Sequence, residues 1–250
     1  MEQTNLTQIR QYFQAETSLL RLERQAAAAE AALNQARYDF RQARQAQVLY
    51  SGSFKSFLDQ LTGKREAAET TLLRAVKTAE AALASAQREK EWADRELPNA
   101  RLRLDALSQW ETLPENTDEE SRNLWFRLEA QYCTEVLLPL LEGNLADLEE
   151  LRRMISGANA GKIYSYGEQA EIQTAPEESA KICAPYLLRL RAAAQILGFS
   201  LPRISYFEDP TGFLNAAAAA HNRRDRLNAA MGQAEAVLRA LPPLQAQLEE

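Results

Sequence analysis

Residues 12–50, YFQAETSLLRLERQAAAAEAALNQARYDFRQARQAQVLY, decide the fold of the first half of this chain. Alternating steps of three and four residues from Tyr12 meet an apolar or aromatic side chain at eleven of twelve positions. These positions are Tyr12, Ala15, Leu19, Leu22, Ala26, Ala29, Leu33, Ala36, Phe40, Ala43, Gln47 and Tyr50. No Gly or Pro interrupts residues 2–51. A seven-residue repeat sustained over this length predicts a helix that packs as a left-handed coiled coil.

A second seam with the same spacing follows the break at residues 51–53. Ten of its eleven positions are apolar: Leu72, Val76, Ala79, Leu83, Ala86, Lys90, Ala93, Leu97, Ala100, Leu104 and Leu107. Alanine-rich seams let two helices approach closely, and a short connection favours an antiparallel pair. We therefore expect an all-α protein in which residues 1–112 form a long antiparallel coiled-coil hairpin with its tip near residues 51–63. Pro98 lies inside the second arm and predicts a kink there.

The expected tip contains a short amphipathic helix. Phe54, Phe57, Leu58 and Leu61 recur at the spacing that places side chains on one helix face. The sequence leaves two arrangements open for this face. The helix either folds back and buries the face on the two arms, or it presents an apolar patch flanked by Lys55, Lys64 and Arg65 to a protein or an anionic membrane surface. The partner-binding residues predicted for the second arrangement are Phe54, Phe57, Leu58, Leu61, Lys64 and Arg65.

Residues 113–250 predict a smaller helical bundle. A capping box at Thr117 and Glu120 indicates a helix from about residue 118, with a kink or a stop and restart at 139–144 and an end at Gly157. A second capping box, Thr174 with Glu177, indicates a helix to Leu197, and Asp209–Pro210 indicates a last helix ending at Pro242–Pro243. Between these, residues 160–175 favour a short irregular or β-hairpin insert because Ile and Tyr are common in strands.

Composition excludes several classes of protein. Gly and Pro are scarce, which argues against disordered and collagen-like chains. The net charge is −6, with the acidic excess in residues 113–250, so a basic nucleic-acid footprint is missing. Cys133 and Cys183 stand fifty residues apart without metal-ligand spacing, and we expect reduced thiols in a cytoplasmic protein. The N-terminus lacks the pattern of a secretory signal, and no apolar run is long enough to span a bilayer.

No catalytic constellation stands out. The single histidine, His221, has no placed nucleophile or second ligand beside it in the sequence, so we predict no catalytic, cofactor-binding or metal-binding residues. Tyrosines at 164, 166, 186 and 206, with Phe207, either complete the bundle core or line a pocket, and a small-molecule ligand is the less favoured alternative.

The sequence thus predicts a non-enzymatic coiled-coil scaffold or adaptor that binds a protein partner or self-associates. The alternative is a peripheral membrane protein that engages anionic lipid through the hairpin tip. Proteins of the phage-shock and ESCRT-III type share this long-hairpin architecture, but no motif of this chain supports more than an analogy of fold.

Overall fold

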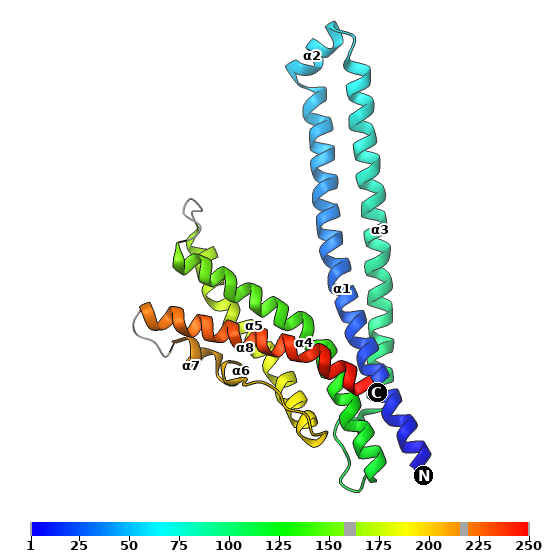
Figure 1. Ribbon diagram of the computed structural model, residues 1–250. Coiled ribbons are helices and arrows are strands. Elements are labelled where there is room, and N and C mark those ends of the chain that lie inside the picture. The colour runs from blue at the N-terminus through cyan, green and yellow to red at the C-terminus, as the bar shows by residue number, and fades with distance from the viewer. Residues whose placement is uncertain (1, 158–163, 216–219, 250) are drawn as a thin grey trace. The chain divides into compact units, whose positions relative to one another are not determined.

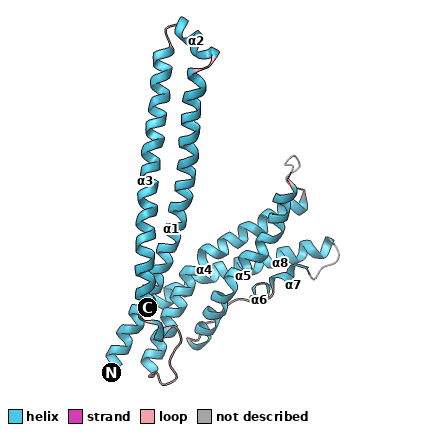
Figure 2. Ribbon diagram, turned by 180° about the vertical axis from the view of Figure 1, so that it is seen from behind, coloured by secondary structure: helices cyan, strands magenta, loops and turns pink. Residues whose placement is uncertain are grey.

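Helices account for every regular element that the structure, a computed structural model, describes within residues 2–157, 164–215 and 220–249 (Figure 1; Figure 2). The all-α prediction is therefore confirmed for the described residues. In chain order the elements are α1 (Glu2–Ser51), α2 (Phe54–Leu61), α3 (Arg65–Asp105), the 3₁₀ turn η1 (Ser108–Trp110), α4 (Glu119–Ser156), α5 (Tyr166–Ile196), α6 (Ser205–Glu208), α7 (Pro210–Asn215) and α8 (Ala220–Glu249).

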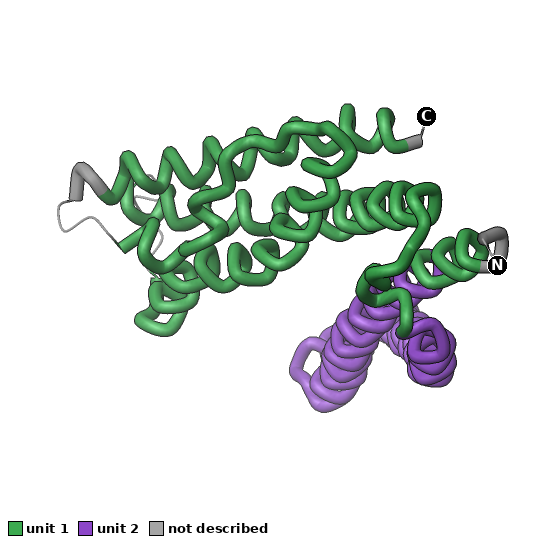
Figure 3. The backbone as a smooth tube through the Cα atoms, turned by 90° about the horizontal axis from the view of Figure 1, so that it is seen from below, with its two compact units in different colours: residues 1–13, 109–250 green, residues 14–108 purple. Residues whose placement is uncertain are grey.

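The chain divides into two units, coloured separately in Figure 3. One unit consists of residues 14–108, which comprise most of α1, all of α2 and α3, and their connections. The other consists of residues 1–13 together with residues 109–250. Helix α1 therefore contributes its residues up to Phe13 to the unit that contains residues 109–250, and its remaining residues to the unit of residues 14–108.

The unit of residues 14–108 is a helical hairpin in which α1 and α3 lie side by side and run in opposite directions (Figure 1; Figure 2). Every position of the two predicted seams is buried or half-buried, whereas all other residues of 21–50 are exposed. Leu33, Ala36 and Ala86 form a buried cluster against which Leu83 packs. Further along the arms, Arg101 Nη2 lies 3.2 Å from Glu23 Oε1. Burial thus follows the predicted seams, and the supercoiling of the two helices stays a prediction.

The unit of residues 1–13 and 109–250, which we call the bundle unit, is built on three long helices, because α4 packs against both α5 and α8. Its largest fully buried side chains come mainly from these helices and include Leu137, Leu141, Leu148, Leu187, Leu190, Leu227 and Leu241. The start of α1 joins this core: Ile9 and Phe13 are buried, and the ring centroid of Phe13 lies 5.7 Å from that of Trp125.

The predicted β-hairpin insert is wrong for residues 166–175, which belong to α5. Residues 158–163 of that prediction lie outside the described residues. Helix α5 begins with a capping box at Ser165 and Glu168, and this N-cap lies nine residues before the Thr174 that the sequence indicated. The Ser165 hydroxyl accepts from the Glu168 N–H, and the Glu168 carboxylate accepts from the Ser165 N–H at 2.7 Å. These bonds satisfy two backbone donors and start the helix despite the modest helix propensity of Tyr and Ile.

The predicted helix end at Pro242–Pro243 is wrong, and of the two alternatives left open at residues 139–144 the stop and restart is wrong. Helix α4 continues through Pro139 to Ser156, and α8 continues through Pro242 and Pro243 to Glu249. A proline removes one backbone hydrogen bond, but Leu137, Leu141 and Leu248 on the same helices are buried, and this packing stabilises the turns on either side. The start of α4 was predicted closely, although its N-cap is Asp118 rather than Thr117. The predicted last helix consists of α7 and α8, with residues 216–219 outside the described part of the chain.

Candidate functional site at the hairpin tip

The tip of the hairpin is α2 with its two connections, residues 51–65. Ser53 caps the start of α2: its hydroxyl accepts from the Ser56 N–H at 3.2 Å and donates to the Tyr50 carbonyl at 2.8 Å. At the other end, Gly63 adopts a left-handed conformation with φ of +70°, which L residues rarely adopt. The chain then turns into α3, and the Lys64 N–H donates to the Asp59 carbonyl at 2.8 Å. Both ends of this eight-residue helix are therefore fixed by hydrogen bonds.

The polar face of α2 is the face turned toward the rest of the hairpin. Ser56 is only 3% exposed. The Tyr50 hydroxyl at the end of α1 donates to Asp59 Oδ2 at 2.8 Å. Partial desolvation, reinforced by this bond, raises the pKa of Tyr50 above its ordinary value of 10.0. Arg65 Nη1, at the start of α3, donates to Gln60 Oε1 at 2.7 Å. Polar contacts thus attach α2 to both arms.

The apolar face of α2 is exposed in consequence. Phe54 is 74% exposed, Phe57 56%, Leu58 45% and Leu61 70%. The two phenylalanine rings stack on each other at a centroid distance of 6.2 Å. An ordinary surface helix turns this kind of face inward, whereas α2 turns it outward. Of the two arrangements that the sequence left open, the structure shows the exposed patch.

The basic residues around this patch differ in their contacts. Arg65 is half-buried, and its Nε lies 2.7 Å from Glu69 Oε1, an ion pair that raises the pKa of the guanidinium. Arg65 therefore connects α2 to α3. Lys55 and Lys64 are exposed, and no described residue forms an ion pair with either. We call the exposed set Phe54, Phe57, Leu58, Leu61, Lys55 and Lys64 the tip patch.

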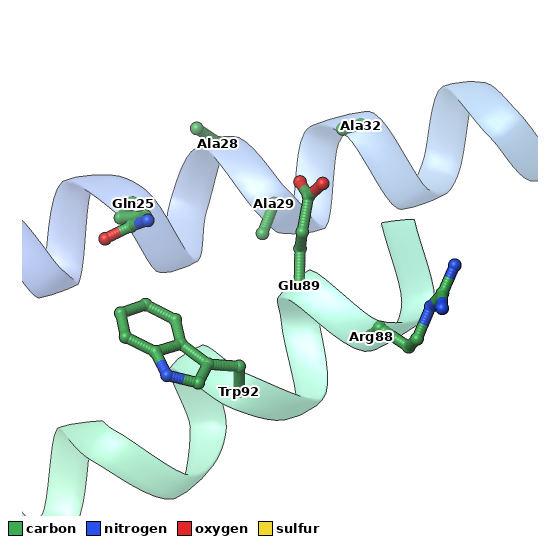
Figure 4. Close-up of a pocket in the computed structure, with 7 residues that line it drawn as sticks. All are labelled: Gln25, Ala28, Ala29, Ala32, Arg88, Glu89 and Trp92. Carbon is green, nitrogen blue, oxygen red and sulfur yellow. The ribbon is translucent and has the colours of Figure 1, made fainter. Parts of the chain in front are cut away.

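A shallow groove lies on the flank of the same hairpin (Figure 4). It has about 450 Å³ of space, and its lining residues are Gln25, Ala28, Ala29, Ala32, Arg88, Glu89 and Trp92. Alanines from α1 form one wall, and Trp92 of α3 lies across from them with its ring partly exposed (Figure 4). The charged side chains of Arg88 and Glu89 belong to adjacent residues of α3 rather than converging from different elements. The groove offers apolar contact area and no evident reactive group.

The sequence did not reveal two buried polar clusters of the bundle unit. Glu129 is almost fully buried, and its carboxylate accepts two hydrogen bonds from Arg189, whose Nη2 lies 2.8 Å from Oε2. The sequence did contain a signal for the burial of Glu129, because this residue lies four residues after Trp125 and three before Tyr132, on the apolar stripe of α4. A second cluster joins α4, α5 and α6: Asn144 Nδ2 donates to the Pro176 carbonyl at 2.9 Å, and the Tyr206 hydroxyl donates to the same carbonyl at 2.7 Å. Both clusters tie helices together, and neither opens into a described pocket.

The tyrosines considered as pocket residues lie in different surroundings in the described part of the chain. Tyr206 and Phe207 are fully buried in the core, whereas Tyr166 is exposed at the start of α5. Burial raises the pKa of Tyr206 well above its usual range, so this hydroxyl stays protonated. His221 lies in the first turn of α8, and its side chain is outside the described part of the structure.

Within the described residues, no three side chains of His, Cys, Asp or Glu are grouped so that they would hold a metal ion. The described helices also include none with an apolar stretch sufficient to cross a bilayer. Comparison with known proteins identified no matching family model, curated protein or solved structure.

Proposed function

We propose that this chain is a non-enzymatic scaffold or adaptor, in which a coiled-coil hairpin arm carries a docking surface at its tip. The hairpin attaches the helical bundle to another component of the cell through α2. Catalysis, a cofactor and a nucleic-acid partner play no part in this function. The proposed location is the cytoplasm, where buried cysteines such as Cys133 and Cys183 stay reduced.

The length of the hairpin formed by α1 and α3 supports its proposed role as an arm. Helix α3 has 41 residues, which corresponds to about 60 Å at 1.5 Å per residue. The seams bury mostly alanine and leucine along this length, and a seven-residue repeat is the pattern by which two helices supercoil. We therefore propose that α1 and α3 form an antiparallel coiled coil. An extended pair of helices encloses little volume for a reaction but places its tip far from its base.

The observation that carries the proposal is the outward apolar face of α2. Exposed contiguous apolar side chains on a protein surface commonly mark a binding site. In this hairpin, hydrogen bonds keep the apolar face of α2 exposed, because Ser53, Tyr50 and Arg65 bind the polar side and the ends of the helix. A helix that merely closed the hairpin would be more stable with its phenylalanines turned toward the arms.

A photocrosslinking amino acid at position 57 of the full chain tests this function in the cells that produce the protein. The matched control carries the same amino acid at the exposed position 77 of α3, outside the tip. The proposal expects adducts that form at position 57 and not at position 77, identified as lipid or protein by mass. Equal adducts at the two positions, or none at either, would show that the tip is not a docking surface.

A further inference from the structure

We propose that the tip patch docks on the surface of an anionic lipid bilayer, with the apolar face of α2 inserted at the interface and Lys55 and Lys64 in contact with lipid headgroups. This inference rests on the proposed function, because it names the partner of the docking surface described above. Three features of the tip support it: the distribution of side chains around α2, the size of the patch and the pairing of its charges.

The side chains of α2 divide into two clear faces. At 100° per residue, Phe54, Phe57, Leu58 and Leu61 fall within about a quarter of the helix circumference. Ser56, Asp59 and Gln60 lie on the opposite side, which contacts the arms. Lys55 lies at the border between the faces, where a long side chain reaches the headgroups while its neighbours insert. A helix with Phe and Leu on one face and Lys beside it is the type that lies in a membrane interface.

The size of the patch argues against a second copy of the chain as its partner. A fully buried aromatic side chain covers about 150–250 Å², so four partly exposed side chains present on the order of 500 Å². Two tips pairing face to face would bury at most roughly 1,000 Å² in total, less than the 1,200–2,000 Å² of a stable interface. Insertion into a bilayer requires no matching surface, since lipid tails adapt to each apolar side chain.

The charges at the tip also favour an anionic surface. Asp59 accepts from the Tyr50 hydroxyl, and Glu69 is paired with Arg65, so these two carboxylates are engaged within the hairpin. Glu66 lies in the first turn of α3, where a negative charge is favourable for the helix N-terminus. Lys55 and Lys64 are exposed without an ion pair to any described residue. Cations beside an apolar face are the arrangement that anionic headgroups complement.

Binding at a site this small needs both the insertion of apolar side chains and the attraction between lysines and anionic headgroups. A single short apolar element gives only marginal membrane affinity, and stable association takes a second, electrostatic contribution. We therefore expect binding to vesicles that contain phosphatidylglycerol, little binding to vesicles of phosphatidylcholine alone, and weaker binding as salt concentration rises.

Co-sedimentation of the full chain with these two kinds of vesicle is the test. The variant Phe54→Ser/Phe57→Ser removes apolar contact at the tip, and its matched control Tyr38→Ser/Leu102→Ser removes two comparably exposed apolar side chains from the arms. The inference predicts at least a tenfold loss of binding for the tip variant and no significant loss for the control. Far-UV circular dichroism of each variant checks that the helices are retained.

A second pair of variants tests the charges. Lys55→Gln/Lys64→Gln should weaken binding to the anionic vesicles several-fold, whereas Arg74→Gln/Lys77→Gln on the exposed side of α3 should not. A polarity-sensitive dye at Leu61→Cys should shift its emission to the blue when vesicles are added, and the same dye at Leu102→Cys should not.

Failure to bind anionic vesicles, or equal loss of binding in tip and control variants, would overturn the inference. A dimer in light scattering that dissociates in Phe54→Ser/Phe57→Ser would also overturn it, because the patch would then bind a second copy. Protein adducts at position 57 in the crosslinking experiment, without vesicle binding, would reject a lipid partner and retain the docking function. No adducts of either kind would reject both.

Discussion

The hydroxyl of Tyr50, at the end of α1, donates a hydrogen bond of 2.8 Å to Asp59 in the middle of α2. This bond joins the polar face of α2 to the first arm, and Asp59 lies opposite the exposed phenylalanines. Together with the bond from Arg65 to Gln60, it holds the tip helix in the orientation that exposes its apolar face.

Tyr50→Phe should therefore loosen α2 without unfolding the arms. The substitution removes the hydroxyl and keeps the ring, so the main loss is the bond to Asp59. We expect amide hydrogen exchange in residues 54–61 to accelerate several-fold while exchange in residues 20–45 is unchanged. Tyr38→Phe, on an exposed ring of α1, is the matched control and should change neither. Unaltered exchange in α2 of Tyr50→Phe would show that this bond does not fix the tip.

The bond from Tyr50 to Asp59 also predicts that amide hydrogen exchange in α2 depends on pH. Partial desolvation and the bond to Asp59 raise the pKa of Tyr50 above 10.0, its value in an unfolded chain. Because the pKa of Tyr50 is raised in the folded state, the bond stabilises the tip fully below pH 10. This stabilisation is lost as the pH rises through the folded-state pKa of Tyr50. Exchange in α2, corrected for its intrinsic dependence on pH, should therefore increase above pH 10 in the wild type. In Tyr50→Phe this additional increase should be absent.

The seams make a prediction about the arms. Ala86 is buried against Leu33 and Ala36, whereas Ala84, two residues earlier on α3, is exposed. Ala86→Asp places a carboxylate in the seam without a partner and should destabilise the hairpin by on the order of 3 kcal/mol. Ala84→Asp should change its stability by less than about 0.5 kcal/mol. Urea unfolding followed by circular dichroism compares the two, and equal stability would contradict the pairing of α1 with α3.

The sequence predicted the arms well because their burial depends on one repeating interval. Leu33 and Ala86 could be assigned to the seams from spacing alone, and both are buried. The orientation of the tip helix was harder to predict, since the spacing of Phe54 and Phe57 shows that they share a face but not whether that face is covered. That outcome depends on contacts such as Tyr50 to Asp59, which join residues of different helices.

The bundle was predicted less accurately for a related reason. Pro242 is a local signal for a helix end, and tertiary packing overrides it in α8. At Pro139 the sequence left a kink and a stop with restart open, and α4 is continuous there. Ser165 and Glu168 carried the correct capping signal for α5, but the strand propensity of the neighbouring Tyr and Ile obscured it. Glu129 and Arg189 are sixty residues apart in the sequence and lie on different helices, so spacing within one helix cannot reveal their pairing.

Glu129 and Arg189 make a prediction about the stability of the bundle. The Arg189 guanidinium lies 5.5 Å from the ring centroid of Tyr132 and 5.9 Å from that of Tyr186, so the pair is enclosed by aromatic rings. Glu129→Ala leaves this guanidinium without its carboxylate and should lower the free energy of unfolding by about 2 kcal/mol. The loss is smaller than for a fully buried pair because Arg189 is partly open to water.

Glu235→Ala is the matched control for this pair. Glu235 forms an exposed ion pair with Arg239 one turn along the same helix, and its removal should cost less than about 0.5 kcal/mol. Urea unfolding of both variants gives the comparison. If the two substitutions cost the same, the enclosed pair would add nothing to the stability of the bundle.

The two cysteines make the last prediction. Burial raises the pKa of the Cys183 thiol to about 12, and Cys133 is equally inaccessible. A thiol reacts with Ellman's reagent as its thiolate, so neither residue should react in the folded protein near neutral pH. Both should react once guanidinium chloride unfolds the chain. Leu61→Cys on the exposed face of α2 is the positive control and should react at once in the folded state. Rapid labelling of either native cysteine in the folded wild type would mean that α4 and α5 open readily where they pack, contrary to a tightly packed bundle.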